Sequence, residues 1–136
     1  LCSQRAELKI LTPHIKEMER LTGLPAEKIE ENSLELAERF AKSWNAVIVL
    51  KNYRTVIAFP DGKCYINPLG NEGMATGGSG DVLAGCLTGL LAGSAAGKDQ
   101  AKAILCGVYR HSLAGDLAYW QKGAAAMLAS DIISNL

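Results

Sequence analysis

A cluster of glycines followed directly by one acid is the part of this sequence whose residue types could do chemistry. Gly73, Gly77, Gly78 and Gly80 fall within eight residues, and Asp81 comes next. Because glycine has no Cβ, the backbone there can adopt positive φ, approach a ligand closely and turn successive N–H groups toward one anion. Such a loop suits phosphate, and a tight turn that only precedes a capped helix is an equal alternative.

The residues after the glycines place this loop at the start of a helix. Val82–Leu91 is uncharged and helix-compatible, and the unpaired N–H groups and dipole of a helix N-terminus favour negative charge. Asp81 then has two interpretations. It caps the first turn, which stabilises a helix by up to about 1 kcal/mol, or it accepts a proton from a hydroxyl that attacks phosphorus. The glycines and the acid alone leave both open.

The longer string Asn67–Leu83, reading NPLGNEGMATGGSGDVL, resembles the signature of the ADP- or ATP-dependent NAD(P)H-hydrate dehydratases, the YjeF C-terminal type domain of the ribokinase-like superfamily. The resemblance implies an enzyme that repairs hydrated NADH or NADPH. It would phosphorylate the ring hydroxyl of the hydrate and eliminate phosphate, with ADP or ATP and Mg²⁺ as cofactors. It also implies an α/β class with a three-layer α/β/α ribokinase-like fold, of which this chain would be the C-terminal half.

The same resemblance assigns roles around the glycines and at a second motif. Asp81 would bind the hydrated cofactor and deprotonate its hydroxyl. Leu11–Met18 is similar to another family signature, in which His14 would contact the hydrated nicotinamide, although the family usually has Pro-Gly where this chain has Ile15-Lys16. The residues assigned to the nucleotide phosphates are Gly77, Gly78, Ser79 and Gly80.

A polar stretch between two predicted strands matches the family's nucleotide-binding segment. Lys51 and Thr55 agree with the family pattern, whereas Asn52 stands where glycine is usual. From the residues alone, Lys51 and Arg54 could equally be exposed at a strand end. The resemblance implies that the adenine nucleotide contacts Lys51, Asn52, Tyr53, Arg54 and Thr55.

Strand and helix patterns alternate along the chain, as expected of an α/β fold. Val47–Leu50 is continuously apolar, which predicts a strand buried on both faces. His14 lies where a strand end meets a helix start, the usual place for sites in α/β sheets. The other predicted elements are a strand at Leu8–Leu11, helices at Pro13–Gly23, Ala26–Trp44 with a restart at Asn32-Ser33, Val82–Leu91 and Ala101–Trp120, a hairpin of Val56–Phe59 with Lys63–Ile66, and a final helix near Ser130.

Two features of the C-terminal helices are interpreted as structural. Gly85, Gly89 and Gly93 recur every four residues, so we expect that helix face to pack closely on a helix or a sheet. His111 and Asp116 lie in a helical stretch rather than at the carboxyl end of a strand. We therefore expect them to stabilise the fold and not to act on substrate.

Composition excludes several classes of function. The 136 residues carry 14 basic and 14 acidic side chains, so net charge gives no case for nucleic acid or an anionic membrane. The longest uncharged run, Val82–Gly97, is shorter than the 18 or more apolar residues of a membrane span. Leu1–Ile10 lacks a secretion signal, and the four cysteines show no CxxC pair. We predict a cytoplasmic protein without a metal site of its own.

The family domain is substantially longer at its N-terminus, and this chain begins abruptly at Leu1. We therefore predict that residues 1–136 form a single partial domain. A sheet cut in this way exposes an unpaired strand edge, which is a template for pairing with another chain. We expect a homo-oligomer, and we expect these residues alone not to turn over substrate.

Two other functions fit the same residues. Another ribokinase-like kinase, acting on a small vitamin or sugar alcohol, could use the same glycines and Asp81 for any hydroxyl acceptor. An inactive fragment could instead serve only as an assembly or nucleotide-binding module. His14 and the stretch Asn67–Ala75 discriminate the dehydratase from the kinase.

Overall fold

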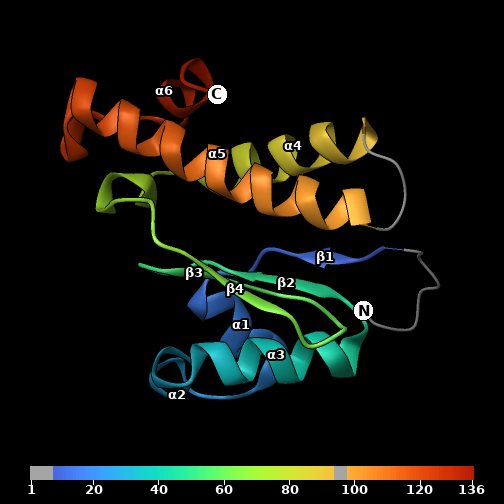
Figure 1. Cartoon of the computed structure of the whole chain (residues 1–136). Coiled ribbons are helices and arrows are strands. Elements are labelled where there is room, and N and C mark those ends of the chain that lie inside the picture. The colour runs from blue at the N-terminus through green and yellow to red at the C-terminus, as the bar shows by residue number, and fades with distance from the viewer. Residues whose placement is uncertain (1–7, 94–97) are drawn as a thin grey trace. The chain divides into compact units, whose positions relative to one another are not determined.

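The computed structural model describes residues 8–93 and 98–136, which form two compact units divided between Pro68 and Leu69. The first unit holds a sheet with helices, and the second is helical (Figure 1). The predicted α/β class is therefore confirmed. The prediction that residues 1–136 belong to one partial domain stays a prediction.

The first unit contains a mixed sheet of four strands in the order β1-β2-β3-β4. β1 is parallel to β2, and the other neighbours are antiparallel. The strand predicted from Leu8 is shorter than expected, although Val47 N–H still donates to Lys9 O over 2.8 Å. The strands are β1 Ile10–Leu11, β2 Val47–Leu50, β3 Thr55–Ala58 and β4 Cys64–Asn67.

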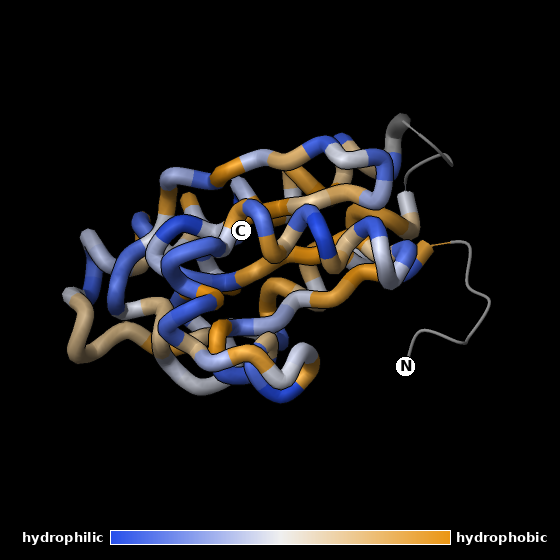
Figure 2. The backbone as a smooth tube through the Cα atoms, turned by 90° about the horizontal axis from the view of Figure 1, so that it is seen from below, coloured by the Kyte–Doolittle hydropathy of each residue, from blue (hydrophilic) through white to orange (hydrophobic). Residues whose placement is uncertain are grey.

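Three helices cover one face of this sheet (Figure 1). They are α1 Ile15–Thr22, α2 Ala26–Glu31 and α3 Ser33–Trp44. α1 ends where Gly23 adopts a left-handed conformation, φ 72°, and donates to Glu19 O. The chain restarts at Ser33 as predicted. Figure 2 shows polar and apolar residues alternating along the helices, the pattern of amphipathic helices with one face in a core.

The core of the first unit lies between the sheet and its helices. Every residue of β2 is buried, as its continuous apolar run predicted. Ile48 and Leu50 meet Met18 of α1 and Ile29 of α2, and all four side chains are fully buried. β2 therefore lies at the centre of the unit. Its carboxyl end positions the polar residues that follow it in the chain.

The second unit is built on two long helices that pack together. Its elements are a 3₁₀ turn η1 Glu72–Ala75, α4 Ser79–Ala92, α5 Lys98–Lys122, a second 3₁₀ turn η2 Ala124–Ala126 and α6 Ala129–Ser134. Ala114, Ala118, Met127 and Ile132 form its buried core. Within residues 8–93 and 98–136, no helix has the length and apolar character needed to cross a membrane.

The contact between α4 and α5 does not use the glycine stripe of α4, and the expected packing of that stripe on a helix or a sheet stays a prediction. A Cβ built at Gly85 or Gly89 meets no other atom within 4 Å. The contact with α5 instead uses the α4 face that carries the buried Leu83 and Leu87. The glycine that allows the approach is Gly107 of α5, where an added Cβ would lie 2.8 Å from Leu87 Cδ2.

Candidate active site

The glycine-rich loop leads directly into α4, as the sequence predicted. Gly78 precedes the helix with φ 91°, a left-handed conformation that favours glycine. Val82 N–H donates to Gly78 O over 3.0 Å, which is the first hydrogen bond of the helix. The N–H groups of Gly80 and Asp81 therefore belong to the first turn, whose donors have no acceptor within the helix. They lie at the positive end of the helix dipole.

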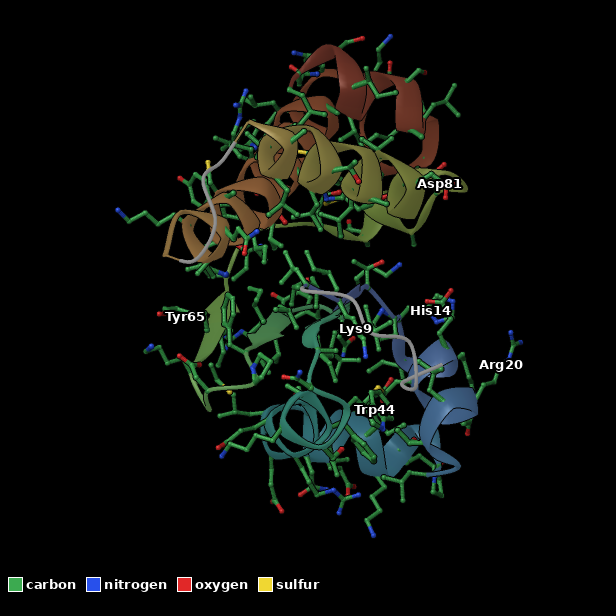
Figure 3. All side chains as sticks on the ribbon, turned by 90° about the vertical axis from the view of Figure 1, so that its right-hand side faces the viewer. Lys9, His14, Arg20, Trp44, Tyr65 and Asp81 are labelled. Carbon is green, nitrogen blue, oxygen red and sulfur yellow. The ribbon has the colours of Figure 1, made fainter. Side chains whose placement is uncertain are left out.

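Asp81 lies in this first turn and is exposed to solvent. Figure 3 shows its side chain at the surface, at the N-terminal end of α4. Ser79, two residues earlier, is buried. A carboxylate in this position is accessible to a ligand that binds at the start of the helix.

Gly78 gives a stability prediction for the loop. We expect Gly78→Ala to destabilise the protein by about 1–2 kcal/mol, because a side chain is strained in the left-handed region and its Cβ would lie 3.2 Å from Ala129 Cβ. Gly85→Ala is the matched control on the same helix, where the added Cβ meets open space and alanine favours the helix. Urea unfolding midpoints measure both. Equal destabilisation by the two substitutions would contradict the assigned conformation of Gly78.

A carboxylate from α5 holds the segment that precedes the glycines. Asp116 accepts hydrogen bonds from Gly70 N–H at 3.2 Å and from the side-chain amide Nδ2 of Asn71 at 2.8 Å. The amide oxygen of Asn71 in turn accepts from Gly73 N–H at 3.0 Å. Sequence reasoning assigned Asp116 a structural role but missed its contact with this loop, since the partners are 45 and 46 residues apart.

His111 of α5 reaches the first residue of α4. Its Nε2 atom lies 3.0 Å from the backbone oxygen of Ser79, in a buried environment. About two turns further along α5, Tyr119 donates to Glu72 Oε1 over 3.3 Å. The predicted structural role of His111 therefore includes fixing the beginning of the helix that carries Asp81.

In the first unit, the structure brings His14 and Lys51 together. They form a parallel bridge at the carboxyl ends of β1 and β2, and Lys51 N–H donates to Pro13 O over 2.8 Å. His14 rather than Pro13 precedes the helix as its N-cap, because its ring Nδ1 accepts from Glu17 N–H over 3.2 Å. Pro13 thus lies before the first turn in which we placed it. Figure 3 shows His14 at the start of α1.

Glu17 is a member of this cluster that sequence reasoning did not identify. Its carboxylate oxygen Oε2 accepts from His14 N–H at 2.7 Å and lies 3.7 Å from His14 Nε2. The same oxygen lies 3.9 Å from Lys51 Nζ. A signal was present, because a glutamate three residues after an N-cap is the spacing of a capping box.

A broad, open depression lies beside this cluster, with a volume of ≈ 360 Å³. Its walls come from the end of β1 and one side of α1, so it belongs to the motif that contains His14. The lining residues are Leu11, Thr12, Pro13, Glu17, Arg20 and Leu21.

The stretch from Lys51 to Thr55 connects β2 to β3. Asn52 Oδ1 accepts from Tyr53 N–H over 2.8 Å, and the Tyr53 side chain is 82% exposed. Arg54 is also exposed, while Thr55 opens β3 and pairs with Asn67. Asn67 is buried and begins the glycine-rich signature, so this pairing fixes where the signature leaves the sheet.

Cys64, Cys86 and Cys106, the cysteines within the described residues, are free thiols. Burial raises the pKa of the Cys86 thiol on α4 and of the Cys64 thiol on β4, which keeps both thiols protonated at neutral pH. Across the part of the chain that the structure describes, no three His, Cys, Asp or Glu side chains are close enough to hold a metal ion.

Comparison with known proteins decides the family. The family model for NAD(P)H-hydrate dehydratase matches residues 2–136, nearly the whole chain. The chain belongs to the NAD(P)H-hydrate dehydratase family. The chain is 53% identical over 127 residues to the bifunctional NAD(P)H-hydrate repair enzyme Nnr of Moorella thermoacetica, which covers 93% of this chain and 23% of that protein.

Solved structures of similar proteins share the fold. The ADP/ATP-dependent NAD(P)H-hydrate dehydratase of Bacillus subtilis, co-crystallised with ATP and Mg²⁺, is 39% identical with a TM-score of 0.88, covering 96% of this chain and 46% of that one. A ribokinase-like superfamily protein from Enterococcus faecalis is 38% identical with a TM-score of 0.75, covering 92% and 41%. The predicted ribokinase-like fold is therefore confirmed, and the chain spans about half the length of these solved relatives.

Proposed function

We propose that this dehydratase-family chain supplies the phosphate-handling part of an enzyme that dehydrates hydrated NADH or NADPH with ADP or ATP. The observation that carries the proposal is an exposed carboxylate, Asp81, in the first turn of a helix that begins at a left-handed glycine. Anion-binding donors and a proton acceptor then stand within one helical turn. The names of the relatives support the substrate class.

In the proposed reaction, the two groups at the start of α4 have different roles. The backbone N–H groups of the segment Gly77–Gly80 bind the phosphate and stabilise the charge that develops on it during transfer. Asp81 accepts the proton of the substrate hydroxyl. Because a backbone donor needs no reorganisation, the loop is prepared for the transition state before the nucleotide arrives.

The bonds that change are confined to the hydrate and the nucleotide. The hydroxyl oxygen forms a bond to the terminal phosphorus, the bond from that phosphorus to the leaving nucleotide breaks, and the hydroxyl proton passes to Asp81. Phosphate then leaves as its C–O bond breaks, and loss of a proton from the neighbouring carbon completes the double bond of NADH or NADPH.

Residues of the first unit would bind the rest of the ligands. We propose that Lys51, Asn52, Tyr53, Arg54 and Thr55 contact the adenine nucleotide. His14 would contact the hydrated nicotinamide, and its neutral ring carries its proton on Nε2, because Nδ1 accepts the hydrogen bond from Glu17 N–H. Nε2 can therefore donate to a polar group of the substrate.

Mg²⁺ fits this chain as an ion carried by the nucleotide. The described residues contain no set of three side-chain ligands for a metal, and Mg²⁺ commonly binds through substrate phosphates and water. When bound, it would neutralise part of the phosphate charge.

A turnover assay tests the proposed function. The whole protein is incubated with hydrated NADH or NADPH and with ADP or ATP, and recovery of the reduced nucleotide is followed by absorbance. Recovery that requires the adenine nucleotide is expected. Phosphorylation of a vitamin or sugar alcohol without recovery would identify another ribokinase-like kinase. Nucleotide binding without any turnover would identify a binding or assembly module.

The same proposal includes a homo-oligomer in the cytoplasm. The support for the homo-oligomer is that β1 and β4 are edge strands of the described sheet, and an unpaired edge can pair with another chain. Sedimentation at micromolar concentration measures the oligomeric state, and a concentration-independent monomer would contradict this part of the proposal.

A further inference from the structure

We propose that Asp116 and Asn71 form a latch through which α5 positions the glycine-rich loop for phosphoryl transfer. The latch rests on the function proposed above, and it assigns a positioning role to two residues outside the phosphate-binding glycines. We define the latch as the Asp116 carboxylate, the Asn71 side-chain amide and the two backbone N–H groups that they bind.

Each hydrogen-bond donor of the latch is paired with an acceptor of the latch. One carboxylate oxygen of Asp116 accepts from Gly70 N–H, and the other accepts from Asn71 Nδ2. The remaining atom of the amide, Oδ1, accepts from Gly73 N–H. Three donors thus meet three acceptors, so the segment that enters the loop has one preferred conformation. The side chains are partly buried, where such charge-assisted bonds are stronger than in water.

Other contacts of α5 extend the latch on both sides of the loop. His111 fixes Ser79 at the loop's exit, and Tyr119 binds Glu72. A Cβ at Gly115 would overlap Met74 of η1, so α5 and the loop approach as closely as glycine permits. The loop is consequently attached to α5 before and after its glycines.

Attachment matters because phosphoryl transfer depends on positioning. A shift of about 1 Å in a positioned group can cost about 100-fold in rate. The latch residues do not touch the reacting atoms in this proposal. They act by holding the backbone donors that do, and a change in the latch should therefore lower kcat more than it weakens nucleotide binding.

An exchange of the two side chains tests the latch. Asp116→Asn alone places two N–H donors against each other, and Asn71→Asp alone places two carboxylates against each other. In the double variant, the new Asn accepts from Gly70 N–H and donates to the new carboxylate, which still accepts from Gly73 N–H. All three hydrogen bonds are restored, and only the bond between the two side chains has its donor and acceptor reversed.

We expect each single substitution to lower kcat of the whole enzyme by about 10-fold or more and the double variant to recover most of that loss. Glu30→Gln, which removes an exposed carboxylate on α2, is the control and should leave kcat unchanged. A thermal shift in the single variants with an unchanged kcat, or a double variant no better than the worse single one, would overturn the latch.

Amide hydrogen exchange measures the conformation of the loop directly, so this part of the test does not depend on turnover. Peptides covering Gly73–Gly80 should exchange faster in both single variants and at the parent rate in the double variant. If the parent enzyme fails to recover NADH or NADPH, the proposed function is wrong, and the exchange pattern still decides the latch. Unchanged exchange in the single variants would overturn it.

Discussion

Asp81→Asn in the full-length protein lowers kcat by at least about 100-fold and leaves the Kd for ADP or ATP nearly unchanged. A general base acts on the proton that moves in the transition state and contributes little to nucleotide binding. Asn has almost the same shape as Asp, so it removes the proton acceptor without disturbing the first turn of α4. Steady-state kinetics with hydrated NADH, together with nucleotide titration, measure the two quantities.

Stability separates this role from helix capping. If Asp81 only complements the helix dipole, the substitution should cost up to about 1 kcal/mol of unfolding free energy and leave kcat close to the parent value. A parallel loss of nucleotide affinity and rate would instead make Asp81 a binding residue. Unfolding in urea, recorded on the same preparation, supplies the comparison.

Leu36→Ala is expected to destabilise the protein by about 2–5 kcal/mol, the usual range for removing a large side chain from a packed core. Leu36 on α3 is 4% exposed and belongs to the core of the first unit. The loss combines the transfer free energy of the missing methyl groups with the cavity they leave. Urea denaturation monitored by circular dichroism measures the change.

Leu34 supplies a matched control for this substitution. It lies on the same helix, two residues earlier, and is 44% exposed. Leu34→Ala removes the same atoms from a position largely in water, so we expect a change of less than about 1 kcal/mol. If both substitutions had the same effect, α3 would not pack on the sheet through the face that contains Leu36.

The local elements could be predicted because each rests on short-range chemistry. Val47–Leu50 is continuously apolar, and the restart at Ser33 follows an asparagine that ends α2. The sequence identified Gly73, Gly77, Gly78 and Gly80 as residues that can adopt positive φ, and of these four only Gly78 does so. Such signals lie within a few residues of the feature they determine.

The supporting residues of the site could not be predicted, since they depend on which segments meet in space. Asp116 and Asn71 are 45 residues apart, and His111 is 32 residues from Ser79. The face of α4 that packs on α5 could not be predicted for the same reason. The spacing of the glycines shows which face of α4 lacks side chains, but it does not show which face packs on α5. That face is the one with Leu83 and Leu87.

The separation between Asp116 and the loop has a consequence for protein synthesis. A ribosome makes the chain from its N-terminus, so all the glycines of the motif emerge well before the carboxylate that holds their loop. The nascent glycine-rich segment therefore has its full sequence but not its final conformation. A premature stop codon between Ala92 and Asp116 would release a chain that contains Asp81 and every glycine of the motif, yet lacks the carboxylate that binds the segment before them.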